Sequence, residues 1–183
     1  GQMVYPLIDE QWEYLPNRRE DVDKALAALP DLYISIDLGP QLVLGGSRSA
    51  LDNATKLLPA VSSGAHQFPM KLPLHSAFHT PLMERTARAA QRDLADLAWQ
   101  QPHIPIIDGC SNIWKPKSTN INALKTYTLG PQVLEHYDFT NMIRTALRNF
   151  APDNIILLGP GGNLGKAVAY AVIKERWKGI SCK

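Results

Sequence analysis

The sequence is poor in several features that mark large classes of protein. Among its 183 residues are only two cysteines, Cys110 and Cys182, which lie far apart and lack the spacing of metal ligands. We therefore expect two reduced thiols, as in a cytoplasmic protein. No run of apolar residues is long enough to span a bilayer, so no contact with a membrane is expected.

An excess of charge of one sign is also missing. The chain has 19 Lys and Arg against 17 Asp and Glu, which gives a net charge of +2, and the basic residues are scattered. A nucleic-acid-binding protein usually gathers basic residues on one face, so no nucleic-acid partner is expected. The hydrophobic content of 45% and the charged content of 20% are ordinary for a globular protein of one or two domains.

Three catalytic or binding motifs are incomplete. The segment Gly45-Gly46-Ser47-Arg48-Ser49 lacks the second glycine of a Gly-x-Ser-x-Gly nucleophile elbow, and we interpret Ser47 as a helix cap. The pair Gly159-x-Gly161 lacks the third glycine of a dinucleotide turn. His75 and His79 have the spacing of zinc ligands on a helix, but prolines flank them and no third ligand is evident. No metal or redox cofactor is therefore expected.

The first 72 residues show a regular alternation of strand-like and helix-like patterns. Period-2 or short apolar runs predict strands at 2–7, 32–38, 41–44 and 66–72. Two helical patterns lie between them, so the order is β-α-β-β-α-β. That order predicts a ferredoxin-like subdomain over residues 1–73.

The two helices in this part have recognisable ends. Asn17 and Glu20 have the spacing of a capping box, and the pattern that follows ends at Pro30. Ser47 or Ser49 is expected to cap the second helix, which a later proline ends.

The remainder of the chain alternates helices with short apolar runs. We predict a long helix over 81–98, with Leu82, Leu94 and Leu97 as candidate core residues, and further helices near 123 and over 139–150 and 163–174. Apolar runs at 104–107 and 154–158 predict buried strands. This pattern predicts a parallel α/β domain over 74–183.

One histidine stands in an unusual segment, Leu74-His75-Ser76-Ala77-Phe78-His79-Thr80-Pro81-Leu82-Met83. A loop flanked by prolines can fix His79 while one ring face stays open, and a neutral imidazole suits general-base chemistry. A histidine in such a place is more often structural. However, the segment resembles the histidine segment of malonyl-CoA:acyl-carrier-protein transacylases and of the acyltransferase domains of polyketide and fatty-acid synthases. Weaker similarities follow in the family's order at 42–46, 100–107 and 158–161.

The resemblance implies an α/β fold made of the ferredoxin-like subdomain and the C-terminal part of a hydrolase-like domain. It assigns His79 as the base for a serine nucleophile. Glu135 is the expected donor of the main-chain carbonyl that orients this base, since it precedes the pair Phe139-Thr140. Phe78 is expected to favour malonyl groups, and Asp37 to line the substrate groove.

The implied function is transfer of malonyl, or a related acyl group, from coenzyme A to an acyl-carrier protein. The expected partners are malonyl-CoA, the carrier protein, and an N-terminal segment or separate chain that carries the serine. An incomplete parallel sheet should then expose apolar surface or be covered by that segment. Two alternatives remain open: a non-catalytic module that binds a carrier protein or another partner, and a thioesterase-like hydrolase.

Overall fold

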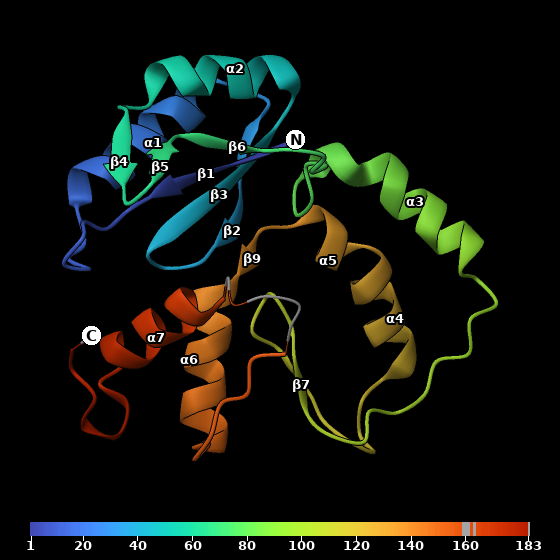
Figure 1. The fold of residues 1–183 in the computed structure, drawn as a ribbon. Helices are drawn as coiled ribbons and strands as arrows, with labels where there is room; N and C mark the ends of the chain where they lie inside the picture. Colours follow the sequence, from blue (N-terminus) through green and yellow to red (C-terminus); the bar gives the residue numbers. More distant parts are fainter. Residues whose placement is uncertain (159–161, 163, 183) are drawn as a thin grey trace.

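A five-stranded sheet forms the centre of this mixed α/β protein (Figure 1). The computed structural model describes residues 1–158, 162 and 164–182. The strand order is β6-β1-β3-β2-β9, in which the first four strands are antiparallel and β9 runs parallel to β2. Their bounds are Gln2–Pro6 for β1, Leu32–Asp37 for β2, Gln41–Gly46 for β3, Met70–Leu72 for β6 and Tyr137–Asp138 for β9.

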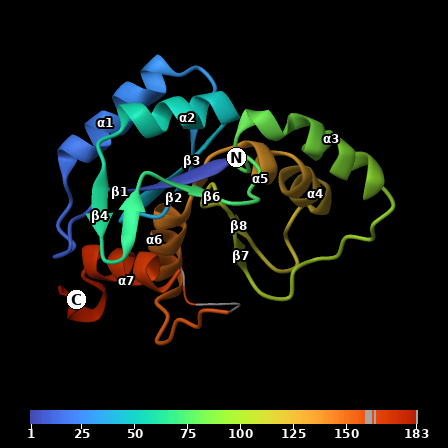
Figure 2. The ribbon, with the colours of Figure 1, turned by 45° about the horizontal axis from the view of Figure 1, so that its top comes forward.

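Helices α1 (Pro16–Ala28) and α2 (Arg48–Leu57) cover one face of this sheet (Figure 2). Side chains alternate between the faces of a strand, so every second residue of β1 and β3 points toward these helices. Full burial of one such side chain stabilises the fold by about 1.5–3 kcal/mol. The core they form includes Met3, Tyr5, Val22, Leu42, Leu44, Leu51 and Ala54.

The predicted strands and helices of this region are present, with two corrections. Helix α1 begins at Pro16 and has no side-chain cap, so the capping box of Asn17 and Glu20 was wrong. Proline suits the first helical position, where its missing N–H costs nothing. The strand predicted over 66–72 is divided into β5 (His66–Phe68) and β6 at Pro69, which cannot donate to a ladder. Strand β5 pairs with β4 (Val61–Ser63) instead.

The rest of the chain is mostly helical. Pro81–Met83 (η1) leads into α3 (Glu84–Asp93), and α4 (Ile121–Leu129), α5 (Pro131–Leu134), α6 (Phe139–Phe150), α7 (Gly165–Lys174) and η2 (Trp177–Gly179) follow. Two short strands, β7 (Ile106–Ile107) and β8 (Ile113–Trp114), form an antiparallel pair.

A second core lies where α6 and α7 pack beside β2. It contains Phe139, Ile143, Leu147, Val168 and Ala171, with Ile36 and Leu38 packed against it. Glu175, just after α7, accepts hydrogen bonds from Arg144 and Arg148 of α6 at 2.7 and 3.0 Å. Because β9 pairs with β2, the sheet continues across the boundary predicted at residue 73.

Three predictions about the second part of the chain were wrong. The helix expected over 81–98 ends at Asp93, and its candidate core residues Leu82, Leu94 and Leu97 are exposed. Residues 154–158 form no strand, and Ile156 and Leu158 are 81% and 86% exposed. At 104–107 only the last two residues form a strand, and Ile104 is 73% exposed. Too little of the described structure lies over these residues to bury their apolar side chains.

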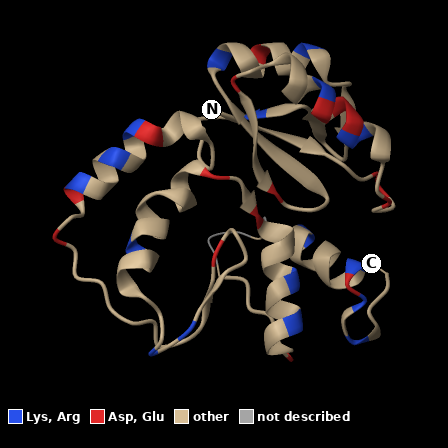
Figure 3. Cartoon of the chain, turned by 180° about the vertical axis from the view of Figure 1, so that it is seen from behind, with Lys and Arg blue, Asp and Glu red and all other residues tan. Residues whose placement is uncertain are grey.

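Lys and Arg positions and Asp and Glu positions are spread over the helices and loops, and neither sign is confined to one part of the chain (Figure 3). No helix within the described residues is long and apolar enough to cross a membrane. Cys110 and Cys182 are free and exposed.

Candidate active site

His79 lies in the loop between β6 and η1, where the antiparallel sheet meets the helical part of the chain. Its main-chain N–H donates a 2.9 Å hydrogen bond to the carbonyl of Val133 in α5. The φ angle of His79 is +58°, in the left-handed region that side chains with a Cβ seldom adopt. Such a conformation costs of order 1–3 kcal/mol and is typical of functional sites, where the surrounding structure holds it in place.

Buried hydrogen bonds hold the other side of this loop on the sheet. The Ser35 hydroxyl, on β2, donates to the carbonyl of Phe78 at 2.7 Å. The Gln2 amide, on β1, donates to that hydroxyl at 2.7 Å. Thr80 is completely buried, and its hydroxyl donates to the carbonyl of Ala77 at 2.6 Å. Groups from two strands therefore hold Phe78, and a bond within the loop holds Thr80 on the other side of His79.

Gly45 provides the space for this arrangement. A Cβ at this position in β3 would lie 2.6 Å from the Cγ2 atom of Thr80 and 3.4 Å from the Cβ atom of Ser35. Only a residue without a side chain allows the histidine loop to approach the sheet so closely.

The His79 imidazole is about half buried against Tyr137 of β9. The two rings meet edge to face, with centroids 5.2 Å apart. Nδ1 is buried without a hydrogen-bond partner in the described part of the chain. Burial lowers the pKa of His79 below 6.5, the nearby carbonyl of Gln132 opposes this change, and His136 adds to it. The net effect favours a neutral imidazole near pH 7, which can accept a proton.

Tyr137 is in turn held by the turn that follows β7. Its ring lies on Gly109, where a Cβ would come within 2.4 Å of the tyrosine Cδ2 atom. The buried carboxylate of Asp108 accepts hydrogen bonds from the Trp114 indole at 2.9 Å and from two main-chain N–H groups. The pKa of Tyr137 is raised by its burial and then by Asp108, so its hydroxyl stays protonated.

The structure shows the surroundings of the other residues singled out in the sequence. The main-chain carbonyl of Gln132, three residues before Glu135, lies near the His79 ring and raises its pKa, while the role expected of the Glu135 carbonyl stays a prediction. Phe78 is 43% exposed beside the histidine. The Asp37 carboxylate accepts from the N–H of Gly39 at 2.7 Å and from the Thr140 hydroxyl at 3.3 Å, which fixes the turn after β2.

Sequence reasoning missed most of the supporting residues. Ser35 was a detectable signal, because a polar residue in a strand between apolar neighbours needs a partner. Gly45 was another, because glycine inside a strand often marks a close approach of another segment. Gln2, Gln132 and Tyr137 carry no such signal, since their contacts join positions far apart in the chain.

The incomplete motifs are accounted for where the structure describes them. Ser47 caps α2, as predicted, by accepting from the N–H of Ala50 at 3.2 Å. His75 is exposed, and its Nδ1 lies 2.9 Å from the carbonyl of Pro73. No group of metal-binding side chains occurs among the described residues. Gly159 and Gly161, and with them most of the Gly-Pro-Gly similarity, lie outside the described residues.

Solved structures show where this fold occurs. The malonyl-CoA:acyl-carrier-protein transacylase of Burkholderia pseudomallei is 21% identical, with a TM-score of 0.70, over 93% of this chain and 55% of that protein. The malonyl-transacylase solved with a type II polyketide synthase acyl-carrier protein is 17% identical, with a TM-score of 0.70, over 93% and 52%. The acyltransferase domain from the second module of the salinomycin polyketide synthase is 22% identical, with a TM-score of 0.66, over 93% and 36%.

Comparisons of the sequence alone give no further relatives. No known protein-family profile matches the chain. No curated protein matches it either. The class defined by the fold is therefore mixed α/β, with the partial fold of acyltransferases. More particularly, the structure matches malonyl-CoA:acyl-carrier-protein transacylases and a polyketide synthase acyltransferase domain, and the chain spans about half the length of the transacylases.

Proposed function

We propose that this chain supplies the histidine half of an acyltransferase that moves malonyl, or a related acyl group, from coenzyme A to an acyl-carrier protein. The observation that carries the proposal is the state of His79. Hydrogen bonds to Val133 and from the Ser35 hydroxyl hold its loop, and burial lowers the pKa of its imidazole, which favours the neutral form near pH 7. The match to transacylases supports the same chemistry, and one of the matched structures contains an acyl-carrier protein.

In this proposal the nucleophile is a serine on another segment or chain. His79 takes the proton of the serine hydroxyl as the oxygen attacks the thioester carbonyl, and returns it to the departing coenzyme A thiolate, which leaves an acyl-serine. The carrier-protein thiol then attacks the acyl-serine while His79 accepts the thiol proton and passes it to the released serine oxygen. The main-chain carbonyl of Glu135 would orient the imidazole, and the nearby Gln132 carbonyl would favour the imidazolium that forms in each step. Phe78 would limit the space for branched acyl groups, and Asp37 would act by shaping the turn after β2.

Domain organisation is part of the proposal. We interpret residues 1–73 as the ferredoxin-like subdomain and 74–183 as part of the larger hydrolase-like domain. The exposed apolar segments 104–107 and 154–158 would be covered by the serine-bearing segment. Their side chains include Ile104, Ile156 and Leu158, and exposed apolar surface of this kind marks an interaction site. Addition of strands to such segments would pair their main-chain groups as well.

A transfer assay tests the proposal. Radiolabelled malonyl-CoA and a carrier protein are incubated with this chain, either alone or together with a serine-bearing transacylase segment. We expect transfer only in the second case. Stable covalent labelling of this chain alone would contradict the proposal, because the chain would then hold its own nucleophile. Hydrolysis of the thioester without transfer would instead indicate a thioesterase.

A further inference from the structure

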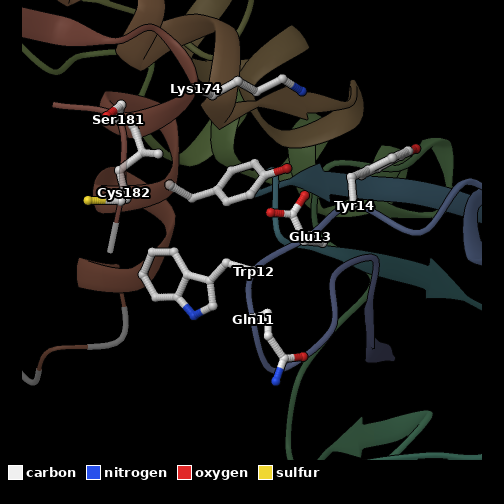
Figure 4. Close-up of a pocket in the computed structure, with 9 residues that line it drawn as sticks. Gln11, Trp12, Glu13, Tyr14, Lys174, Ser181 and Cys182 are labelled. Atoms are coloured by element: carbon white, nitrogen blue, oxygen red, sulfur yellow. The ribbon is translucent and has the colours of Figure 1, made fainter. Parts of the chain in front are cut away.

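A second site lies away from His79, between the loop that follows β1 and helix α7. Here a pocket of about 710 Å³ opens between residues 11–14, one side of α7 and the segment after η2 (Figure 4). Its volume is within the range of small-molecule sites. The lining residues are Gln11, Trp12, Glu13, Tyr14, Tyr170, Ile173, Lys174, Ser181 and Cys182.

The loop that carries Trp12 is built to hold its shape. The Asp9 carboxylate accepts from the N–H groups of Gln11 and Glu13 at 2.9 and 2.8 Å. The Asp9 N–H donates to the Glu13 carbonyl at 3.0 Å. Trp12 between them has a φ of +70°, which is uncommon for so bulky a residue. The loop therefore presents a large aromatic side chain at the pocket at some conformational cost.

Two lysines of α7 lie over aromatic rings at this pocket. The Lys174 ammonium is 5.9 Å from the ring centroid of Tyr14 and 5.8 Å from that of Tyr170. The Lys166 ammonium is 5.7 Å from the Trp12 ring. Within the described part of the chain neither lysine forms an ion pair with a carboxylate. Their positions, eight residues apart on one helix, place positive charge at both ends of the aromatic surface.

Polar groups lie beside the rings. Glu13 and Gln11 border the pocket opposite α7, and in Figure 4 Lys174 and Trp12 lie on opposite sides of it. The buried Tyr170 hydroxyl stays protonated, because burial raises its pKa and Tyr14, Glu13 and Asp37 raise it further. The pocket thus combines flat apolar walls, a hydrogen-bond acceptor in Glu13 and the Lys174 ammonium, with the Lys166 ammonium beside it over the Trp12 ring.

We infer that this pocket binds a nucleotide whose base carries an amino group. The base would stack on Trp12 and Tyr14, its amino group would donate to the Glu13 carboxylate, and Lys174 and Lys166 would bind phosphate. Stacking of a base on an aromatic side chain contributes about 1–3 kcal/mol, and lysine is a common phosphate ligand. The inference does not depend on acyl transfer, since none of these residues is assigned to that reaction.

Two ligands share this chemistry, a free adenine nucleotide and the nucleotide end of coenzyme A. Isothermal titration calorimetry with ADP, coenzyme A, adenosine and pyrophosphate distinguishes them. We expect saturable binding of ADP, and at least tenfold weaker binding of adenosine and of pyrophosphate, since each retains only one of the two contacts. If coenzyme A binds as tightly as ADP, the pocket accepts the nucleotide end of coenzyme A. If coenzyme A does not bind, the ligand is a free adenine nucleotide.

Variants locate the binding. Trp12→Leu should weaken ADP binding by about 5- to 150-fold, the equivalent of one stacking contact. Lys174→Gln combined with Lys166→Gln should weaken it at least tenfold and reduce its salt dependence. Lys56→Gln, an exposed lysine of α2, is the matched control and should change nothing. Absence of ADP binding at 1 mM would overturn the inference, and so would binding that these variants leave unchanged while circular dichroism shows them folded.

Discussion

The antiparallel sheet with α1 and α2, residues 1–72, differs sharply from the part of the chain that follows. In the first region the large apolar side chains of β1 and β3 are completely buried between the sheet and two helices. In the second, Ile104, Ile156 and Leu158 are exposed, and the Trp99 indole N–H is buried without a hydrogen-bond partner in the described residues. The apolar side chains of the first region pack against its own helices, whereas the second region contains apolar runs whose side chains are exposed.

This difference concerns pairing more than composition. A run such as 154–158 has the residues of a buried strand, but a strand requires neighbours that supply hydrogen bonds and apolar cover. Strand β3 finds both of its neighbours, β1 and β2, within 45 residues of sequence. In the second region 154–158 forms no strand and 104–107 contributes only the two-residue β7, which is why we propose that a serine-bearing segment lies there.

The largest expected effect concerns the residue at which the two regions meet. In the assembled enzyme, His79→Ala should lower acyl transfer by roughly two to four orders of magnitude, the usual scale for loss of a positioned general base. The measurement is the rate of radiolabelled malonyl transfer at pH 7. Folding should change little, because the half-buried imidazole contributes little to either core. A loss of less than fivefold would contradict the assignment.

Core substitutions test the contrast directly. Leu44→Ala should destabilise the chain by about 2–5 kcal/mol, because it leaves a cavity between the sheet and its helices. Ile156→Ala should change the free energy of unfolding of the isolated chain by less than about 0.5 kcal/mol, because the side chain is exposed. Urea denaturation measures both. Equal effects would mean that 154–158 is buried in solution, and the contrast would then be lost.

Gly45 tests how closely the histidine loop must approach the sheet. Gly45→Ala should cost about 1–3 kcal/mol, because the new Cβ would overlap the completely buried Thr80. Gly165→Ala is the control, since within the described residues a Cβ there meets Leu157 alone, at an ordinary 3.7 Å. Chemical denaturation compares the two variants. A Gly45→Ala protein as stable as the control would show that the loop can move away without loss.

The smallest expected effect is on pH dependence. Burial lowers the folded-state pKa of His79 below its ordinary value of 6.5, so the unfolded chain binds this proton more readily. The contribution of His79 to stability is therefore complete above pH 6.5 and is lost as the pH falls from there toward the folded-state pKa. His79→Gln should remove this part of the slope. A pKa above 6.5, measured by NMR titration of the ring, would contradict the burial seen here.

Local pattern predicted the first region well because its determinants are local. The spacing of apolar residues predicted β1, β2, β3 and both helices, with a period of two for strands and of three to four for helices. Ser47 was recognised as a cap from its position. The errors arose where a chain-distant contact decided the result. Helix α3 ends at Asp93, since Leu94 and Leu97 beyond it are exposed and bury little apolar surface, and 154–158 lacks the neighbours that a strand requires.

For the site, the sequence by itself determined which residue to examine. His79 was found from the segment that surrounds it, and the match to transacylase structures agrees with that resemblance. Only the tertiary structure decided how the residue is held. Ser35, Gly45 and Gln132 lie at least 34 residues from His79 in the chain, so their contacts depend on how strands and helices assemble. Apolar periodicity can be recognised from neighbouring residues in the sequence. A hydrogen bond or a close contact between residues far apart in the chain forms only when the chain folds.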